Sequence, residues 1–366
     1  MLRSLEIRNY RNLRHLTIEK LGRVNLLVGK NNTGKTSVLE AVAIYASKQD
    51  EISTIKLLLQ RRGEFYTDST SYLENNLASL SALYTDYDPK YFESDPESGI
   101  HIKEHEVDSN MTSLFIDFRK AYLTSKTDNS GREINEYVVA EQEEDIEQRE
   151  FRHEIKFFRG LRQTTFSLDN QIIFLSNRTN GAPSQFQYVD SKNQTQQPVE
   201  FLYSKIALSD KEDMVVDALK ILEPGTERFS LIKDDQPIIR LGDGKVRKLS
   251  SMGDGVSRVF SIMLSMVNCN GTYLLIDEFE NGLHYSVQEK LWEIIFYLSE
   301  RLNIQVFATT HSNDTIKAFG EVAKSKPEYS DAQLIQLRNV KGIISAVLFN
   351  TDDVETAMET DYLDLR

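Results

Sequence analysis

The sequence predicts an α/β fold in which a mostly parallel β-sheet is covered by helices. Near the N-terminus, the apolar run Val24–Val28 enters a loop rich in Gly and Asn, which leads into a helical pattern. From about residue 241 onward, strand-like and helix-like segments alternate. Alternation of this kind predicts parallel strands, because each strand is followed by a crossover helix that covers the sheet.

The first fifty residues predict strands, then a loop and a helix. "SLEIRNY" and "HLTIEKL" alternate apolar and polar residues, which is the pattern of half-buried strands. "RVNLLVG" is continuously apolar, as a buried central strand should be. "KTSVLEAVAIYAS" carries apolar residues at helical spacing.

The middle of the chain, about 51–240, is less regular. Polar, turn-rich stretches separate strand-like pieces such as "SLFIDF", "HEIKFF" and "NQIIFLS". "DKEDMVVDALKILEP" predicts an amphipathic helix that ends before Pro224. The acidic run Glu141–Glu150 is interpreted as a solvated face, and no sustained heptads indicate a long coiled coil.

The last part of the chain regains order. A loop "SSMGDGVS" precedes a helix "RVFSIMLSMVN", and strand "TYLLIDEFE", helix "HYSVQEKLWEIIFYLSERL" and strand "IQVFATTHS" follow. Another helix is predicted from Asp314. The final stretch "LFNTDDVETAMETDYLDLR" is interpreted as a helical or exposed tail on the basis of its size.

Composition narrows the class of protein. The chain has 366 residues with 43 Lys and Arg against 56 Asp and Glu, a net charge of −13, so its overall field does not steer it to DNA. Cys269 is the single cysteine, which excludes a disulfide within the chain. No apolar run approaches the ~20 residues of a membrane span, and the N-terminus lacks a signal-peptide pattern. We therefore expect a cytoplasmic protein without a membrane partner.

The opening motif predicts a phosphate-binding loop. Residues 29–36 read G-x-x-x-x-G-K-T between a buried strand and a helix. Backbone N–H groups and the helix N-terminus in this arrangement face the β-phosphate, Lys35 reaches the β- and γ-phosphates, and the Thr36 hydroxyl binds Mg²⁺. The predicted nucleotide contacts are Gly29, Asn31, Asn32, Thr33, Gly34, Lys35, Thr36 and Ser37.

Two further strand ends carry polar side chains. Asp277 and Glu278 end an apolar strand, where Asp277 can hold Mg²⁺ and Glu278 can polarise the attacking water. His311 ends the next strand, where it can hydrogen-bond the γ-phosphate or the water.

A second Ser/Gly loop, "SSMGDGVSR", also opens a helix far from the first loop in sequence. One fold rarely points two such helix starts at one phosphate. The pattern therefore predicts that the second loop reaches the nucleotide of another copy of the chain.

These four motifs, in this order, resemble those of ABC-type ATPases related to SMC, RecF and OLD proteins, and most closely the small bacterial branch called AAA15 or AAA21. The resemblance covers residues 1–50 and 242–318. It implies a P-loop NTPase of the ABC/SMC-like type, with a central mostly parallel sheet, an additional strand layer and an inserted helical or lid region. Residues 1–50 and 241–366 would form the two halves of the ATPase domain, and residues 51–240 the insertion and a signature-side subdomain.

The resemblance also implies roles for single residues. Lys35 and Thr36 match Walker A, Asp277 the Walker B aspartate, Glu278 the catalytic base and His311 the switch histidine. The residues implied to lie in the signature loop, which in relatives contacts the partner's γ-phosphate, are Ser251, Gly253, Gly255 and Arg258. Arg11 and Asn12 match a turn that approaches the nucleotide in relatives, and Asn281 occupies the D-loop position.

The function implied is Mg²⁺-dependent hydrolysis of ATP to ADP and phosphate by a homodimer, or a higher homo-oligomer, that sandwiches ATP. ATP would close the dimer and hydrolysis would open it, controlling a separate effector such as a nuclease or toxin in anti-phage defence. The resemblance to OLD nucleases does not extend to a TOPRIM domain. The alternatives are a RecF/SMC-like DNA-repair or DNA-binding ATPase, a transporter subunit, and a module that holds ATP without turnover.

Overall fold

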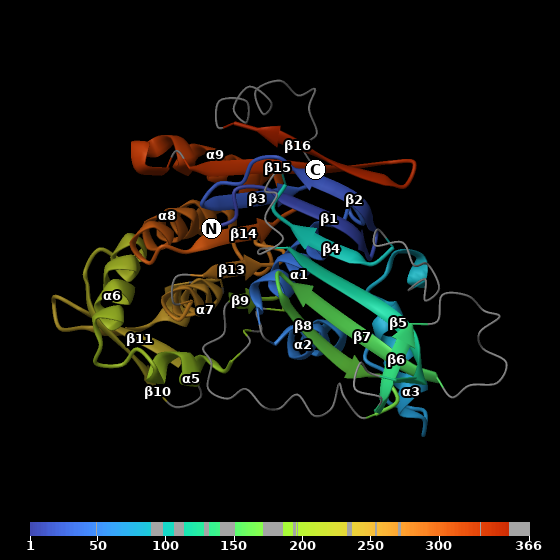
Figure 1. Ribbon diagram of the computed structural model, residues 1–366. Helices are drawn as coiled ribbons and strands as arrows, with labels where there is room; N and C mark the ends of the chain where they lie inside the picture. The colour runs from blue at the N-terminus through green and yellow to red at the C-terminus, as the bar shows by residue number, and fades with distance from the viewer. Residues whose placement is uncertain are drawn as a thin grey trace. The chain divides into compact units, whose positions relative to one another are not determined.

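In the computed structural model the chain forms two compact units. Figure 1 labels their helices and strands. Unit 1 comprises residues 1–4, 18–39 and 183–366, and unit 2 comprises residues 5–17 and 40–182. The described residues are 1–48, 50–88, 98–105, 113–127, 132–139, 151–170, 186–192, 195, 197–232, 236–252, 255–269, 272–329 and 331–350. The division into residues 1–50, 51–240 and 241–366 stays a prediction. Each compact unit is made of more than one stretch of the chain.

Unit 1 is built on a six-stranded sheet. Its strands, in spatial order, are β16 (Ile343–Phe349), β15 (Ala332–Val340), β3 (Val24–Val28), β14 (Gln305–Thr309), β13 (Tyr273–Ile276) and β9 (Phe186–Val189). All neighbours pair in parallel except β15 and β16, which form an antiparallel hairpin at one edge. The mostly parallel sheet is therefore confirmed.

Helices bury apolar side chains against this sheet. The helices of unit 1 are the start of α1 (Lys35–Ala46), α5 (Val199–Ser204), α6 (Asp210–Leu222), α7 (Val256–Val267), α8 (Tyr285–Arg301) and α9 (Asn313–Ser325), and the 3₁₀ helix η5 (Pro327–Tyr329) follows. Trp292 of α8 stacks on Phe279 with ring centroids 4.0 Å apart, and meets Phe319 of α9 edge-on at 5.0 Å. These large buried rings fix the turn after β13 against two helices.

A small antiparallel sheet belongs to the same unit. It consists of β10 (Thr226–Ile232), β11 (Gln236–Leu241) and β12 (Val246–Lys248), and the 3₁₀ helix η4 (Leu249–Met252) leads from it toward α7. Phe229 of β10 contacts Tyr203 at 5.5 Å and Phe260 of α7 at 5.6 Å between ring centroids. These ring contacts pack the small sheet against α7, the helix that follows the predicted signature loop.

Unit 2 contains the additional strand layer. Its seven-stranded sheet consists of β2 (Leu13–Ile18), β1 (Leu5–Tyr10), β4 (Ile100–Lys103), β5 (Leu114–Thr127), β7 (Phe151–Arg159) and β8 (Arg162–Ser167), with β6 (Glu133–Val139) pairing with β5. Strand β5 alternates buried and partly exposed residues, because one sheet face is apolar and the other polar. The end of α1, α2 (Glu51–Arg62), α3 (Tyr72–Ser81) and the 3₁₀ helix η1 (Thr85–Tyr87) complete the unit.

The structure confirms most elements predicted from hydrophobic pattern, including α6, which ends at Leu222 before Pro224. The β15–β16 hairpin was not predicted, and it places Leu348 and Phe349 in a strand although the tail was expected to be helical or exposed. The rest of that tail, the acidic run and most of "NQIIFLS" lie outside the described residues. In the part of the chain that is described, no helix is both long and apolar enough to cross a membrane.

Candidate nucleotide-binding site

Three strand ends bring the predicted catalytic residues to one edge of the unit 1 sheet. The register pairs Ile276 of β13 with Ala308 of β14, and Ala308 with Leu26 of β3, so the carboxyl ends of these strands lie side by side. The glycine-rich loop follows β3, the Asp-Glu pair follows β13, and the segment that contains His311 follows β14. Parallel sheets commonly bind ligands at this edge.

The glycine-rich loop has a backbone that requires glycine at two positions. Gly29 has φ +142°, and a Cβ there would lie 2.5 Å from the carbonyl oxygen of Leu337. Gly34 has φ +87°, also in the region that L side chains rarely adopt. Inside the loop, the Thr33 hydroxyl donates to the Lys30 carbonyl at 2.8 Å. Asn31 and Ser37 belong to the same loop and the first turn of α1.

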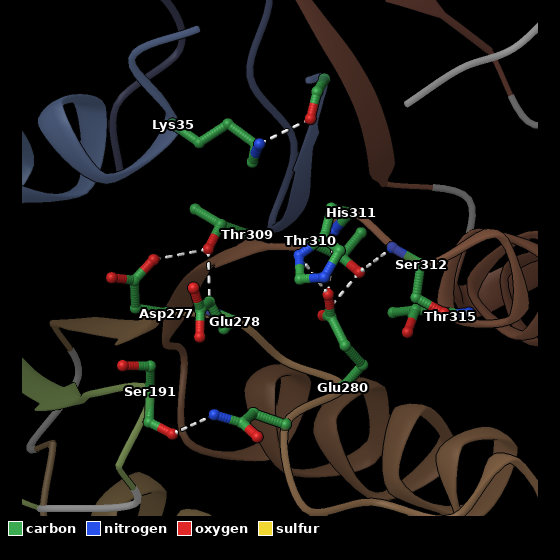
Figure 2. Close-up of polar contacts among 12 residues, drawn as sticks. Lys35, Ser191, Asp277, Glu278, Glu280, Thr309, Thr310, His311, Ser312 and Thr315 are labelled. Atoms are coloured by element: carbon green, nitrogen blue, oxygen red, sulfur yellow. Dashed lines mark hydrogen bonds and ion pairs between the residues drawn. The ribbon is translucent and has the colours of Figure 1, made fainter. Parts of the chain in front are cut away.

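Lys35 folds back over this loop. Its Nζ donates to the carbonyl oxygens of Gly29 at 2.5 Å and Lys30 at 3.0 Å. Figure 2 shows Lys35 with one of these bonds. Burial lowers the pKa of Lys35, while the nearby carboxylates of Glu280, Asp277 and Glu278 oppose that shift. The ammonium group therefore lies inside the loop that the motif predicts to hold phosphates.

Thr36, Asp277 and Thr309 form one hydrogen-bonded group. The Thr36 hydroxyl donates to the two oxygens of Asp277 at 3.1 and 3.3 Å, and the Thr309 hydroxyl donates to Asp277 Oδ1 at 2.7 Å. The group supplies a hydroxyl and a carboxylate, which suit Mg²⁺ when substrate phosphates complete its coordination. No cluster of three or more His, Cys, Asp or Glu in the described ranges is arranged to hold a metal by itself. The residues present therefore fit an ion that is shared with a nucleotide.

Glu278 is held in an unusual backbone conformation. Its φ of +48° is left-handed, which a residue with a Cβ adopts only when its surroundings enforce it. The Glu278 N–H donates to the Thr309 hydroxyl at 2.9 Å, and the next N–H, of Phe279, donates to the Thr309 carbonyl at 2.8 Å. The conformation turns the chain sharply at the end of β13, and neighbouring groups fix it there.

Arg258 also forms hydrogen bonds with this turn. Its guanidinium is buried and donates to the carbonyl oxygens of Asp277 at 3.1 Å, Glu278 at 2.9 Å and Asp190 at 3.3 Å. The resemblance placed Arg258 in a loop that contacts a partner's phosphate. In the structure its side chain instead ties α7 to the catalytic turn within one chain.

His311 pairs with Glu280. Its Nδ1 lies 2.8 Å from Glu280 Oε1, and its backbone N–H donates to the same oxygen at 3.0 Å. The Thr310 hydroxyl donates to the other oxygen, Oε2, at 2.6 Å. The ring of His311 is about half exposed, at 55%, so it is fixed on one side and open on the other.

The predicted signature loop is only partly described. Ser251 lies in η4, where its hydroxyl donates to the Lys248 carbonyl at 2.6 Å, and Gly253 lies outside the described residues. Gly255 is the N-cap of α7, where a Cβ would lie 2.9 Å from the Gly282 carbonyl oxygen. Close packing therefore requires glycine at position 255, next to the turn that contains Asn281. The Asn281 amide donates to the Ser191 carbonyl at 2.6 Å.

Arg11 and Asn12 belong to unit 2, in the turn between β1 and β2. The Arg11 guanidinium is buried and forms ion pairs with Glu40 at 2.7 Å and Glu64 at 2.8 Å. Its contacts are thus with carboxylates of its own unit, and the nucleotide contact remains a prediction.

Sequence reasoning missed Glu280, Thr309 and Thr310. Each lies within three residues of a predicted catalytic residue: Thr309 is the last residue of β14, and Thr310 and Glu280 follow strand ends. A search for every polar side chain beyond those strand ends would have included them.

The glycine-rich loop, the Asp-Glu pair and His311 follow adjacent parallel strands, which is the arrangement expected of a P-loop ATPase. The family model described as "AAA domain, putative AbiEii toxin, Type IV TA system" matches residues 24–316, and the chain belongs to this AAA_21 family. The resemblance noted from the sequence and the predicted ATPase class are thereby confirmed.

The chain is also similar to individual proteins. An "ATP/GTP phosphatase" of Helicobacter pylori is 24% identical over 373 residues and covers 92% of each chain. RecF, the DNA replication and repair protein of Clostridioides difficile, is 34% identical over 90 residues, or 24% of each chain. The SMC head domain of Thermotoga maritima superposes with a TM-score of 0.47 at 12% identity, covering 95% of this chain and 99% of that one.

Proposed function

We propose that this ATPase is a Mg²⁺-dependent enzyme that works as an ATP-switched homodimer and controls a separate effector protein. The single observation that carries the proposal is the convergence of five groups at one sheet edge. These are Lys35, Thr36, Asp277, Glu278 and His311. Together they supply a phosphate-binding cation, oxygen ligands, a base and a hydrogen-bonding imidazole.

Each group has a role in hydrolysis. The loop N–H groups and Lys35 bind and orient the phosphates. Thr36 and Asp277 hold Mg²⁺, which supplies positive charge to the phosphate oxygens when bound. Glu278 accepts the proton of the attacking water, and His311 hydrogen-bonds the γ-phosphate or that water. The backbone bonds of Glu278 to Thr309 and Arg258 hold the base in place before substrate arrives.

The homodimer follows from the second helix start. Gly255 opens α7, whose N-terminus favours an anion. Arg258, in the first turn of α7, bonds the carbonyls of Asp277 and Glu278. A phosphate of the partner's nucleotide that binds at the N-terminus of α7 would therefore be linked, through Arg258, to the turn that contains Asp277 and Glu278. This contact exists only in the closed dimer, so it supplies the differential affinity that an ATP switch requires.

The separate effector is inferred from the family. Its description includes the words "putative AbiEii toxin, Type IV TA system", which connect it with two-component toxin systems. We infer that the closed and open dimers differ in affinity for a nuclease or toxin that acts in anti-phage defence. Capture of one defined protein by the ATP-bound dimer, and its release on hydrolysis, would support the role. Unchanged capture in both states would contradict it.

The base assignment is tested with Glu278→Gln. The amide keeps the size of the side chain but cannot accept the water proton at neutral pH, so turnover should fall at least 100-fold while nucleotide binding persists. Phosphate release and binding of a fluorescent ATP analogue measure the two effects. Turnover like that of the parent would show that Glu278 is not the base.

A DNA-binding role is the second candidate, and one face in unit 2 favours it. The register aligns Arg8, His101, Phe115 and Phe158 across four strands on one sheet face. Ring centroids are 4.5 Å apart for His101–Phe115 and 5.5 Å for Phe115–Phe158, and the Arg119 guanidinium lies 5.5 Å from the Phe158 ring. All five side chains are partly exposed. A row of aromatic rings with flanking cations is a typical platform for single-stranded nucleic acid.

This alternative is tested by fluorescence anisotropy with a labelled single-stranded oligonucleotide at two salt concentrations. Phe158→Ala should weaken binding about tenfold, because base–aromatic stacking contributes about 1–3 kcal/mol per base. Tyr285→Ala removes an exposed ring of unit 1 and is the matched control. Equal affinity of the parent and Phe158→Ala would remove this face as a binding site.

A further inference from the structure

Glu280 is the acidic residue of the site that has no role in the proposed chemistry so far. It lies in the turn between β13 and α8, two residues beyond Glu278. Its two carboxylate oxygens accept bonds from the Thr310 hydroxyl and the His311 backbone N–H, and Oε1 also meets His311 Nδ1. Figure 2 shows the Glu280 side chain pointing toward Thr310 and His311, which follow β14.

In the pair formed by Glu280 and His311, Glu280 is the more rigidly held residue. The Glu280 side chain is 13% exposed and Thr310 is fully buried. The backbone of the turn is closed by the N–H of Asn281, which donates to the Glu278 carbonyl at 3.0 Å, and by the N–H of Leu283, which donates to the Glu280 carbonyl at 2.9 Å. A carboxylate fixed in this way determines how the more exposed imidazole is oriented.

The hydrogen-bond chemistry defines the tautomer. An ionised carboxylate only accepts hydrogen bonds, so the proton of the short contact belongs to His311 Nδ1. The other nitrogen, Nε2, is then the atom presented away from Glu280. Lys35 and Arg258 are cations of the same site, and each interacts electrostatically with Glu280, Asp277 and Glu278.

We propose that Glu280 is a positioning residue that fixes the ring and the Nδ1–H tautomer of His311, so that the unprotonated Nε2 accepts a hydrogen bond from the attacking water. This inference rests on the proposed function of His311. It is the same division of labour as between a catalytic histidine and the carboxylate that orients it in hydrolytic triads.

Kinetics test the coupling between the two residues. Glu280→Ala should lower kcat about 10- to 100-fold with little change in KM, the range typical of groups that orient a functional histidine. Glu280→Gln, which keeps the size and an acceptor oxygen, should fall between Ala and the parent. In a His311→Ala background, Glu280→Ala should cause no further loss, because the two residues act as a unit. Glu289→Ala removes an exposed carboxylate of α8 and should leave kcat unchanged.

The tautomer is measured without turnover by ¹⁵N NMR of the imidazoles, with His311→Gln identifying the His311 signals. The parent should show Nδ1–H, and Glu280→Ala should show both neutral tautomers. Unchanged kcat in Glu280→Ala, an equal loss in the His311→Ala background, or an unchanged tautomer would each overturn the inference. Failure of the proposed function is distinguishable, since it appears as full turnover in Glu278→Gln.

Discussion

The surroundings of Lys35 act on its charge in two opposite directions. Its ammonium bonds two carbonyl oxygens of its own loop, and burial lowers its pKa while three carboxylates oppose the shift. The sequence identified Lys35 because the spacing of the loop is local. The contacts of Glu280 with Thr310 and of Arg258 with Asp277 were not predictable, because each joins two different elements that meet only in the folded chain.

Replacing Lys35 tests the phosphate loop at the residue scale. Lys35→Ala removes the only predicted cation for the β- and γ-phosphates, so the affinity for ATP should fall at least tenfold. The matched control is Lys30→Ala, which removes a solvent-exposed lysine of the same loop and should change the affinity less than twofold. Equilibrium binding of a fluorescent ATP analogue measures both. Equal affinity in the two variants would contradict the assignment.

At the scale of elements, hydrophobic pattern predicted three of the parallel strands, β3, β13 and β14, and the helices that follow them, because each has a strong local signal. It did not predict β9. The β15–β16 hairpin was missed, although its Lys341-Gly342 turn and alternating residues carry a recognisable pattern. The seven-stranded sheet of unit 2 was not predictable as a sheet. It pairs β1 with β4, which is about 90 residues later in sequence, and such pairing depends on tertiary structure.

Gly255, at the start of α7, packs closely against the turn after β13, and replacing it tests the importance of this contact. Gly255→Ala would place a Cβ 2.9 Å from the Gly282 carbonyl oxygen and 3.2 Å from Leu283 Cα, so the helix start or the turn must shift. We expect a loss of about 1–3 kcal/mol in the free energy of unfolding, as for other overpacked sites, together with slower ATP turnover.

Chemical denaturation and phosphate release measure these two changes. Gly225→Ala is the control, because the nearest atom to its new Cβ would be 3.7 Å away. Gly255→Ala with the stability and turnover of the parent would show that the close contact has no functional importance.

At the scale of the whole molecule, the sequence predicted that one chain holds half of each site. That prediction came from two helix starts of similar chemistry, Lys35 and Gly255, each preceded by a glycine-containing loop. Both belong to unit 1, and Arg258 links the second helix to the catalytic turn of the same chain. The proposed dimer would explain why one chain carries both.

The molar mass of Glu278→Gln in Mg-ATP, measured by light scattering after gel filtration, tests the central claim most directly. This variant should bind ATP without hydrolysing it, and we predict a species of twice 42.1 kDa in Mg-ATP and a single chain of 42.1 kDa in ADP. Adding Lys35→Ala to it should abolish the dimer. A Glu278→Gln protein that binds ATP yet remains at 42.1 kDa would contradict the ATP-switched dimer.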